Sequence, residues 1–454
     1  MPTKNKPQKS YTVCLVDGEH YLANLQESLA TIAEIYNVRY LIFIGGTEKI
    51  GTPADVKKAL PYPVFFANKE QGPDCRKLEE ILRKHPVELV LDLSDEPIMD
   101  YLTRFEVACR ILHQGIVYRG SDFEFRPLQF KKILTKPSLA IWGTGKRIGK
   151  TALGGMVGRV LKQCGLKPAI ITLSRGGPTK PIIVRGDQIK IDMDYLLNID
   201  AQGMHASSDC FEDALTARVA TFGCRRCGGG FAGKAMVTVL ERGARMAEKA
   251  PYVQSVILEG SGATIPEIKT DKVILVMDMT QPEAILQGYM TPLRILYADL
   301  IILTMCENFL TDQKKINRVI QRIRQINAAI PIATTVLRPF PLEPIRGKKV
   351  FLACTAPQEA LPFLKKYLEK TYGCRVEGIS NHLSVRPILL RELRGLKNTD
   401  LMLTELKAAA IAVAAKEAKK KGLNTVLMDN HMVVVKKGGN VPDLKKTIAQ
   451  LLKK

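Results

Sequence analysis

Short apolar runs alternate with longer amphipathic stretches in the N-terminal part of the chain. The apolar runs cover residues 11–16, 38–44, 64–67, 88–93 and 116–118. Short apolar runs bounded by polar turns predict strands, and the amphipathic stretches between them predict helices. Strands that alternate with helices are typical of a parallel sheet, so we expect an N-terminal α/β domain.

Four of these predicted strands end in polar or glycine-rich turns. The turns are DGEH (17–20), GGTEK (45–49), DLSDEP (92–97) and YRGSDF (118–123). Ligands collect at the carboxyl ends of the strands in parallel sheets, so the turns are candidates for a binding site. Ordinary connecting loops are the alternative interpretation.

The alternation lapses over residues 125–138, a basic stretch that contains proline, and then resumes. Strands are predicted at residues 139–142, 255–258, 272–277 and 300–305, and residues 168–178 are predicted to form a strand that breaks into a glycine turn. Between residues 178 and 230 the apolar pattern weakens, and Asp, His, Arg and Gly crowd together. Such a segment is typical of an active-site insertion.

A second break, rich in proline, covers residues 339–344. After it we predict a strand at 350–353, a helix at 361–371 and a long alanine-rich helix at 401–421 that Gly422 ends. Nothing in this part indicates a separate chemistry. We expect it to pack on, or to continue, the domain before it.

The segment GTGKRIGKT lies between the predicted strand 139–142 and a helix that ends at Gly165. A glycine-rich turn there points backbone N–H groups inward, and the new helix adds its positive dipole end, so the turn can hold a phosphate. Lys150 is expected to reach the β- and γ-phosphates of ATP, and Thr151 to hold Mg²⁺. The expected nucleotide-binding residues are Gly143, Thr144, Gly145, Lys146, Arg147, Ile148, Gly149, Lys150 and Thr151.

These segments predict an α/β fold. We expect an N-terminal Rossmann-like domain with a parallel sheet (1–130), a P-loop NTPase core (131–345) and an α/β C-terminal segment (346–454). In the core, a buried strand places Glu259 at its end, where a carboxylate can hold Mg²⁺ against the phosphates. Asn308 follows another strand, at a place where such folds often contact a nucleotide base, although an isolated Asn in a loop is also a common turn residue.

Composition narrows the class of protein. The chain is 46% hydrophobic and 25% charged, which is typical of a folded protein. Its ten cysteines are scattered, and residues 1–10 lack the apolar core of a signal peptide, so we expect buried thiols in a cytoplasmic protein. The net charge of +22 fits nucleic acid, an anionic membrane surface or a polyanionic small substrate. The lysine runs 419–421 and 453–454 are expected to be solvated faces.

Several motifs together carry a family resemblance. They are DGEH (17–20), GTGKRIGKT (143–151), LSRGGP (173–178), HASSD (205–209), CRRCGGG (224–230) and LEGSGA (258–263). Over its whole length the chain resembles the archaeal cyclic 2,3-diphosphoglycerate synthetase family, and its P-loop core is similar to that of dethiobiotin synthetase. The resemblance implies a homodimeric, ATP-dependent ligase that uses Mg²⁺ and converts 2,3-diphosphoglycerate to the cyclic diphosphate, with ADP and phosphate as products.

Such a reaction brings many negative charges together. Two unit anions about 4 Å apart repel by about 4 kcal/mol at an effective dielectric constant near 20. Cationic side chains must offset this repulsion, and the glycines after Arg225 and Arg226 add backbone amides to an anion-binding nest. The candidate substrate-binding and catalytic cations are Lys150, Arg175, Arg225, Arg226 and Lys234, with Arg185 and Arg218 as second choices.

The candidate metal ligands are Thr151, Glu259 and Asp209, the last matched to the family by its place in the SSD sequence. The alternatives to Asp209 are Asp187, Asp192 and Asp194. His205 is expected near the substrate without acting as a base, because phosphate nucleophiles are already ionised near neutral pH. CRRC also spells the zinc motif CxxC, but no second ligand pair lies nearby.

Two other functions remain open. One is an ATP-dependent ligase that acts on a carboxylate or carbamate, as dethiobiotin synthetase does. The other is a P-loop ATPase switch that binds DNA or a membrane through its basic surface. Many such switches carry a lysine five residues before the P-loop lysine, where this chain has Gly145. We therefore expect a small-molecule substrate and neither nucleic acid nor membrane as partner.

Overall fold

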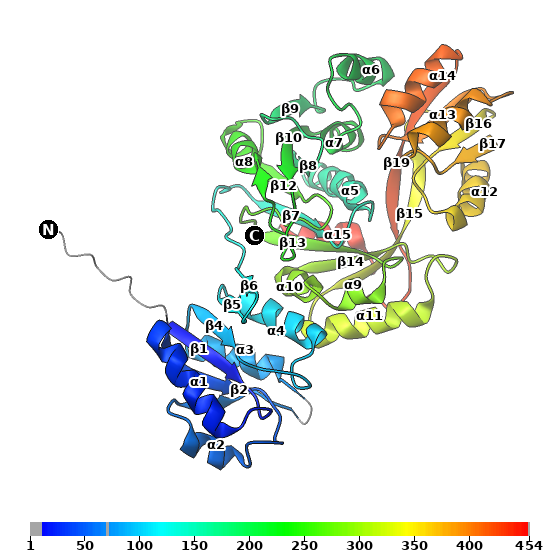
Figure 1. Ribbon diagram of the computed structural model, residues 1–454. Coiled ribbons are helices and arrows are strands. Elements are labelled where there is room, and N and C mark those ends of the chain that lie inside the picture. Colours follow the sequence, from blue (N-terminus) through cyan, green and yellow to red (C-terminus); the bar gives the residue numbers. More distant parts are fainter. Residues whose placement is uncertain (1–10, 70–71, 453–454) are drawn as a thin grey trace. The chain divides into compact units, whose positions relative to one another are not determined.

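The computed structural model describes residues 11–69 and 72–452 (Figure 1). The polar tail at 1–10 and the lysines at 453–454 lie outside the described residues. The chain divides into two compact units, of which one comprises Met1–Gln129 with Gln287–Tyr297 and the other Phe130–Leu286 with Ala298–Lys454. No helix in the described part of the chain is both long and apolar enough to cross a membrane.

The smaller unit contains a sheet of six strands in the order β3-β2-β1-β4-β5-β6. All neighbours are parallel except β5 and β6. The strands are β1 (Tyr11–Val16), β2 (Asn37–Phe43), β3 (Val64–Phe66), β4 (Leu89–Asp92), β5 (Val117–Arg119) and β6 (Glu124–Phe125). The helices are α1 (Leu22–Ile35), α2 (Pro53–Ala59), α3 (Cys75–Lys84), α4 (Tyr101–His113) and α10 (Thr291–Tyr297). The order 3-2-1-4-5 is that of a doubly wound sheet, so the Rossmann-like prediction is confirmed.

The larger unit contains a sheet of thirteen strands in the order β11-β10-β8-β12-β7-β13-β14-β15-β19-β18-β16-β17, with β9 paired to β10. Its first strands are β7 (Ser138–Gly143), β8 (Pro168–Ser174), β9 (Ile182–Arg185), β10 (Ala220–Cys227), β11 (Val237–Thr238), β12 (Ser255–Glu259), β13 (Lys272–Asp278) and β14 (Leu300–Thr304). The later strands are β15 (Ile332–Pro341), β16 (Lys349–Ala353), β17 (Arg375–Ser380), β18 (Leu401–Glu405) and β19 (Asn424–Val434).

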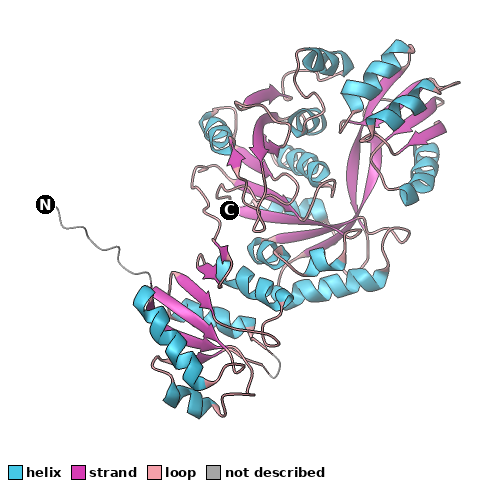
Figure 2. Cartoon of the chain, in the orientation of Figure 1, coloured by secondary structure: helices cyan, strands magenta, loops and turns pink. Residues whose placement is uncertain are grey.

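Helices accompany this sheet along its length (Figure 2). They are α5 (Lys150–Gln163), α6 (Met193–Ala201), α7 (Asp209–Ala217), α8 (Leu240–Lys249), α9 (Glu283–Gln287), α11 (Gln313–Ile326), α12 (Leu361–Tyr372), α13 (Arg386–Arg394), α14 (Lys416–Lys420) and α15 (Leu444–Leu451). A short 3₁₀ helix η1 (Gln358–Ala360) and a π-helix η2 (Ala410–Ala415) complete the set. The α/β class and the P-loop core are thus confirmed.

The C-terminal strands continue the sheet of the P-loop core. β15 and β19 are long antiparallel neighbours, paired from Thr335 with Val434 to Pro341 with Met428, and they stand out as long arrows in Figure 2. β19 then pairs in parallel with β18. The sheet therefore passes without a break from the P-loop strands to the last part of the chain. The division of the chain into three domains stays a prediction.

The prediction of one long helix over residues 401–421 is wrong. Its first five residues form strand β18, and only residues 410–420 are helical, as η2 followed by α14. The run LMLTE is apolar enough for a buried strand or a buried helix, and periodicity over so few residues does not separate the two. In the structure, hydrogen-bonded pairing with β16 and β19 makes residues 401–405 a strand.

The segment at residues 178–230 is also more regular than an insertion. It contains β9, α6 and α7, and β10 lies between β8 and β11 in the main sheet. The first five residues of β10 are buried, and Arg225 and Arg226 lie near its end. The end of β10 and helix α7 are the parts that reach the candidate site.

Glycines in α5 allow helix α7 to approach it closely. A Cβ at Gly158 would lie 3.0 Å from Ala217 Cβ, and one at Gly154 would lie 3.2 Å from Glu259 Oε2 and 3.4 Å from Asp213 Oδ1. A glycine within a helix costs about 0.5–1 kcal/mol relative to alanine. Here the absence of side chains at these glycines allows the carboxylates of α7 and β12 to lie against the first turns of the P-loop helix.

Candidate phosphate-binding site

The predicted P-loop joins β7 to α5 as expected. Gly149 precedes the helix with φ of 95°, and Arg147 also has a positive φ of 62°. A positive φ is accessible to glycine at little cost, which explains Gly149 at the turn. Lys150 Nζ donates a hydrogen bond to the carbonyl oxygen of Gly145, 2.7 Å away, so the side chain lies back over the loop. Burial lowers the pKa of Lys150 to about 8.

The P-loop opens into a cavity of about 300 Å³. Four groups of core residues line it: the loop itself, the turn after β8, the segment that leads into α7, and the end of β12 with the turn after it. Six Lys and Arg side chains face three Asp and Glu side chains there: Lys146, Arg147, Lys150, Arg175, Arg386 and Lys407 against Asp200, Asp209 and Glu259. The excess of positive charge suits a polyanionic ligand.

Two predicted metal ligands are joined in this cavity. Thr151 Oγ1 donates a hydrogen bond to Glu259 Oε1 at 3.0 Å, and Asp209, at the first residue of α7, lines the same cavity. Burial, and next the charge of Asp209, raises the pKa of Glu259 to about 7. The structure thus brings Lys150, Thr151, Asp209 and Glu259 together.

A further carboxyl group, Asp213, lies behind Glu259. Burial first, and the charge of Glu259 second, raise the pKa of Asp213 well above its usual value. Ionisation of Asp213 is therefore opposed both by its burial and by the neighbouring Glu259 carboxylate. Within the described residues, both oxygens of Asp213 and Glu259 Oε2 have no hydrogen-bond partner. Asp213 is four residues after Asp209, on the same helical face, and this spacing is visible in the sequence.

The donor set fits a magnesium ion. Among residues 11–69 and 72–452, no group of three or more His, Cys, Asp or Glu side chains is placed to hold a metal by itself. Mg²⁺ sites in nucleotide-binding proteins usually take one or two carboxylates and complete their octahedron with water and substrate phosphates. The carboxylates of Asp209 and Glu259 and the hydroxyl of Thr151 match that pattern, and Glu259 Oε2 has no hydrogen-bond partner among the described residues.

The predicted arginine nest forms a second, open pocket of about 710 Å³ beside the cavity. Arg175, Arg225, Arg226 and the glycines 228–230 line it, and Arg175 lines the P-loop cavity as well. Arg226 is buried and donates to the carbonyl oxygens of Gly228 (2.9 Å) and Ser261 (3.0 Å). Arg225 Nε donates to the carbonyl oxygen of Gly177 at 2.7 Å. The two arginines are therefore held by backbone carbonyls, and Arg175 belongs to both pockets.

Other predicted residues lie outside these two pockets. Lys234 is exposed and lies 3.9 Å from Glu267, and exposed Asn308 accepts a hydrogen bond from Lys437. Arg185 pairs with Asp187 and stacks on Tyr252. Arg218 ends α7, Asp192 caps α6, and exposed Asp194 lies 3.7 Å from Lys419. The structure gives Asp187, Asp192 and Asp194 roles away from the cavity, and roles for Lys234 and Asn308 stay predictions.

Two cations in the cavity come from the C-terminal strands and had no signal in the sequence. Lys407 follows β18 and lies 3.3 Å from Glu212 and 3.8 Å from Glu405. Arg386 is the first residue of α13. Each is more than 230 residues from the P-loop, so only the continuous sheet brings them to it.

All ten cysteines are free thiols, and seven of them are buried. Cys224 and Cys227 of the CRRC motif are three residues apart on β10, the first buried and the second exposed. Side chains three residues apart on a strand point to opposite faces. These two thiols therefore do not form a common metal site.

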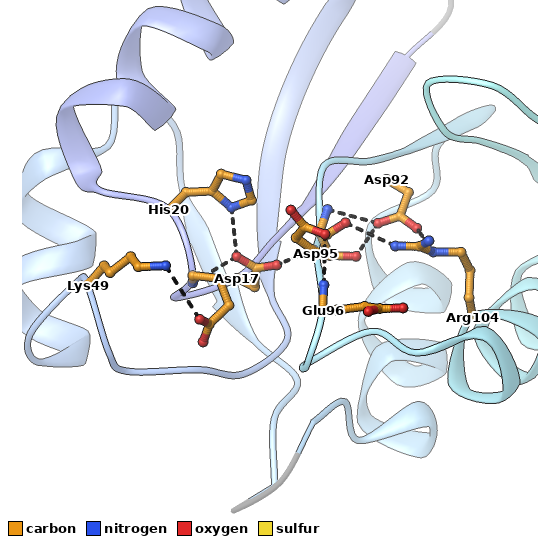
Figure 3. Close-up of polar contacts among 9 residues, drawn as sticks. Asp17, His20, Lys49, Asp92, Asp95, Glu96 and Arg104 are labelled. Carbon is orange, nitrogen blue, oxygen red and sulfur yellow. Dashed lines mark hydrogen bonds and ion pairs between the residues drawn. The ribbon is translucent and has the colours of Figure 1, made fainter.

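Acidic side chains also gather at the carboxyl ends of β1 and β4 in the smaller unit (Figure 3). Asp17 accepts hydrogen bonds from His20 Nδ1 (2.9 Å) and from the backbone N–H of Asp95 (2.5 Å). Asp92 accepts one from Arg104 Nε at 3.0 Å and one from the Tyr118 hydroxyl. These carboxylates hold the two loops in shape.

Three protein-family models match the chain in succession. The N-terminal domain of cyclic 2,3-diphosphoglycerate synthetase matches residues 11–126, its P-loop domain residues 138–336 and its C-terminal domain residues 341–431. Together these models cover most of the chain.

Curated relatives give the same description. Cyclic 2,3-diphosphoglycerate synthetase from Methanothermobacter thermautotrophicus is 44% identical over 93% of this chain and 92% of its own. The protein of that name from Methanothermus fervidus is 44% identical over 95% of each chain. A solved structure of LpxK from Aquifex aeolicus in complex with ATP is 14% identical with a TM-score of 0.41, over 72% of this chain and 91% of its own. That last likeness is too low to carry an argument.

Proposed function

Because the chain belongs to the cyclic 2,3-diphosphoglycerate synthetase family, we propose that it uses ATP to close 2,3-diphosphoglycerate into its cyclic diphosphate. One observation carries this proposal. The P-loop cavity and the arginine pocket are neighbours that share Arg175, so a polyanionic acceptor can lie beside the phosphates of a nucleotide.

The proposed reaction has two steps. In the first, an oxygen of one substrate phosphate attacks the γ-phosphorus of ATP, the bond to the β-phosphate oxygen breaks, and ADP leaves. The acceptor then carries a terminal phosphoanhydride. In the second step, the other substrate phosphate attacks the inner phosphorus of that anhydride, and the outer phosphate leaves as the ring closes. Both nucleophiles are phosphate oxygens that are ionised near neutral pH, so His205 is not needed as a base.

The side chains of the site act by position and charge. The amides of the loop and Lys150 hold the β- and γ-phosphates, and Arg175 lies where the γ-phosphate and the acceptor meet. Arg225 and Arg226, held by backbone carbonyls, present fixed positive charge to the acceptor. Preorganised charge of this kind is the main source of catalysis in phosphoryl transfer.

Asp209, Glu259 and Thr151 are the residues that would hold Mg²⁺. The ion, when bound, supplies positive charge to the phosphate oxygens. Burial, and next the charge of Glu259, raises the pKa of the remaining carboxyl group, Asp213.

Phosphorus NMR tests the proposed function directly. Incubation of the protein with ATP, Mg²⁺ and 2,3-diphosphoglycerate is expected to produce an intramolecular pyrophosphate signal, with ADP and phosphate in equal amounts. Hydrolysis of ATP is expected to depend on the bisphosphate. Formation of ADP without any change in the 2,3-diphosphoglycerate would contradict the proposal. If the protein then also binds DNA with a strong dependence on salt concentration, a P-loop switch protein would be favoured instead.

Arg225 is predicted to act on the acceptor more than on ATP. In Arg225→Ala, we expect the KM for 2,3-diphosphoglycerate to rise about tenfold, as one charge-assisted hydrogen bond is lost, while the Kd for ATP stays within about twofold. Arg245→Ala is the control, since Arg245 is exposed on α8 and pairs with Glu241. Equal kinetics for Arg225→Ala and Arg245→Ala would remove Arg225 from the site.

A further inference from the structure

The C-terminal strands and helices form one wall of the P-loop cavity. The mechanism proposed above assigns no role to the residues of this wall. Its lining residues are Arg386, Lys407, Ala408 and Ala412. Ala408 has a positive φ of 50°, a conformation that costs a residue with a Cβ some stability. The turn that carries Lys407 is thus held in a strained shape where it meets the cavity.

Packing fixes this wall against the helix that carries Asp209. One hydrophobic cluster joins Leu406 and Ile411 of the wall to Leu196 of α6 and Phe211 of α7. A second cluster joins Ala410 and Ala414 of η2 to Leu389 and Leu393 of α13. The elements α7, η2 and α13 therefore form a continuous packed series. Arg386, an exposed residue at the start of α13, lines the cavity from this packed series.

The two cations of the wall differ in their partners. Lys407 lies 3.3 Å from Glu212 and 3.8 Å from Glu405, so its charge already balances buried carboxylates. In the described part of the chain, Arg386 makes no hydrogen bond, ion pair or ring contact, although its side chain lines the cavity. Its guanidinium group has all its donors available to a ligand.

We propose that Arg386 binds a phosphate group of the ligand held in the P-loop cavity. A planar guanidinium presents paired N–H donors that match two phosphate oxygens. The phosphate has two possible sources, the γ-phosphate of ATP and a phosphate of the acceptor. Only the identity of the acceptor rests on the proposed function.

Calorimetric titration of the full chain separates these sources. Each variant is titrated with MgADP, with the magnesium complex of a non-hydrolysable β,γ-imido ATP analogue, and with 2,3-diphosphoglycerate. For Arg386→Ala we expect about a tenfold loss of affinity for either the ATP analogue or 2,3-diphosphoglycerate. A loss for the ATP analogue but not for ADP assigns Arg386 to the γ-phosphate, and a loss for the bisphosphate assigns it to the acceptor.

Two further variants complete the test. Arg391→Ala removes an exposed arginine from the same helix outside the cavity, and it is expected to bind all three ligands as the parent does. Arg386→Lys is expected to recover part of the lost affinity, since it restores the charge without the fork. If Arg386→Ala matches Arg391→Ala in all three arms, the proposal is overturned. If the parent protein itself does not bind the bisphosphate, the proposed function fails. The titrations with MgADP and with the ATP analogue then still test whether Arg386 binds the γ-phosphate.

Discussion

Replacement of Lys150 by alanine is expected to lower the turnover of ATP by about 10²–10³-fold or more, the usual effect of losing one preorganised donor to a transferring group. Lys150 is buried against its own loop and donates to the carbonyl of Gly145 at 2.7 Å. In the complex its ammonium group would exchange that carbonyl for phosphate oxygens. Coupled detection of ADP in the presence of 2,3-diphosphoglycerate measures the effect.

The control for this variant is Lys162→Ala. Lys162 lies near the other end of α5, is exposed, and donates to the carbonyl of Arg218. Its turnover is expected to stay within about twofold of the parent, and circular dichroism of both variants checks that they are folded. Retention of full turnover by folded Lys150→Ala would contradict the assignment of residues 143–151 as the catalytic P-loop.

The second large effect is expected for Glu259→Gln, which should lower ATP turnover by about 10²-fold and leave the Tm unchanged or higher. The side chain keeps its shape and can still accept from Thr151, but it no longer attracts a divalent cation. Stability should not fall, because a buried carboxylate among other carboxylates is costly to keep charged. The new amide is also able to donate to Asp213, whose oxygens have no hydrogen-bond partner among the described residues.

Steady-state turnover at several Mg²⁺ concentrations, together with calorimetric unfolding, tests this prediction. A metal role predicts that the Mg²⁺ concentration for half-maximal rate rises while the Tm is kept. Glu241→Gln, a change at a half-buried carboxylate on α8 outside the cavity, should alter neither quantity. A marked fall in Tm that parallels the lost activity would instead show that Glu259 is needed for the fold.

The P-loop was predictable because all its parts are adjacent in the sequence. The strand, the glycines, Lys150 and Thr151 form one continuous stretch, and the local backbone conformation alone points its amides inward. Glu259 was predictable for a similar reason, as a carboxylate directly after a buried strand. In the smaller unit, the alternation of apolar and amphipathic stretches correctly located all five predicted strands. The first and last residue of each predicted strand differ by at most one position from those in the structure.

Secondary structure and residue roles that depend on contacts with distant parts of the chain were harder to predict from the sequence. The run at residues 401–405 is compatible with helix or strand, and its pairing with β16 and β19 makes it a strand. Asp213 has a helical spacing from Asp209 that the sequence displays, but its role depends on the approach of α7 to Gly154.

The sequence by itself determined the family, the class of fold and the phosphate-binding loop, since each is encoded in short contiguous motifs. Only the tertiary structure decided which cations accompany that loop. Arg175 lies in both pockets, whereas Lys234 and Asn308 lie outside both. Lys407 and Arg386 reach the cavity because β15 and β19 pair and carry the sheet on into the C-terminal strands. Long-range strand pairing and core packing set such positions, and neither leaves a local pattern in the residues that it brings together.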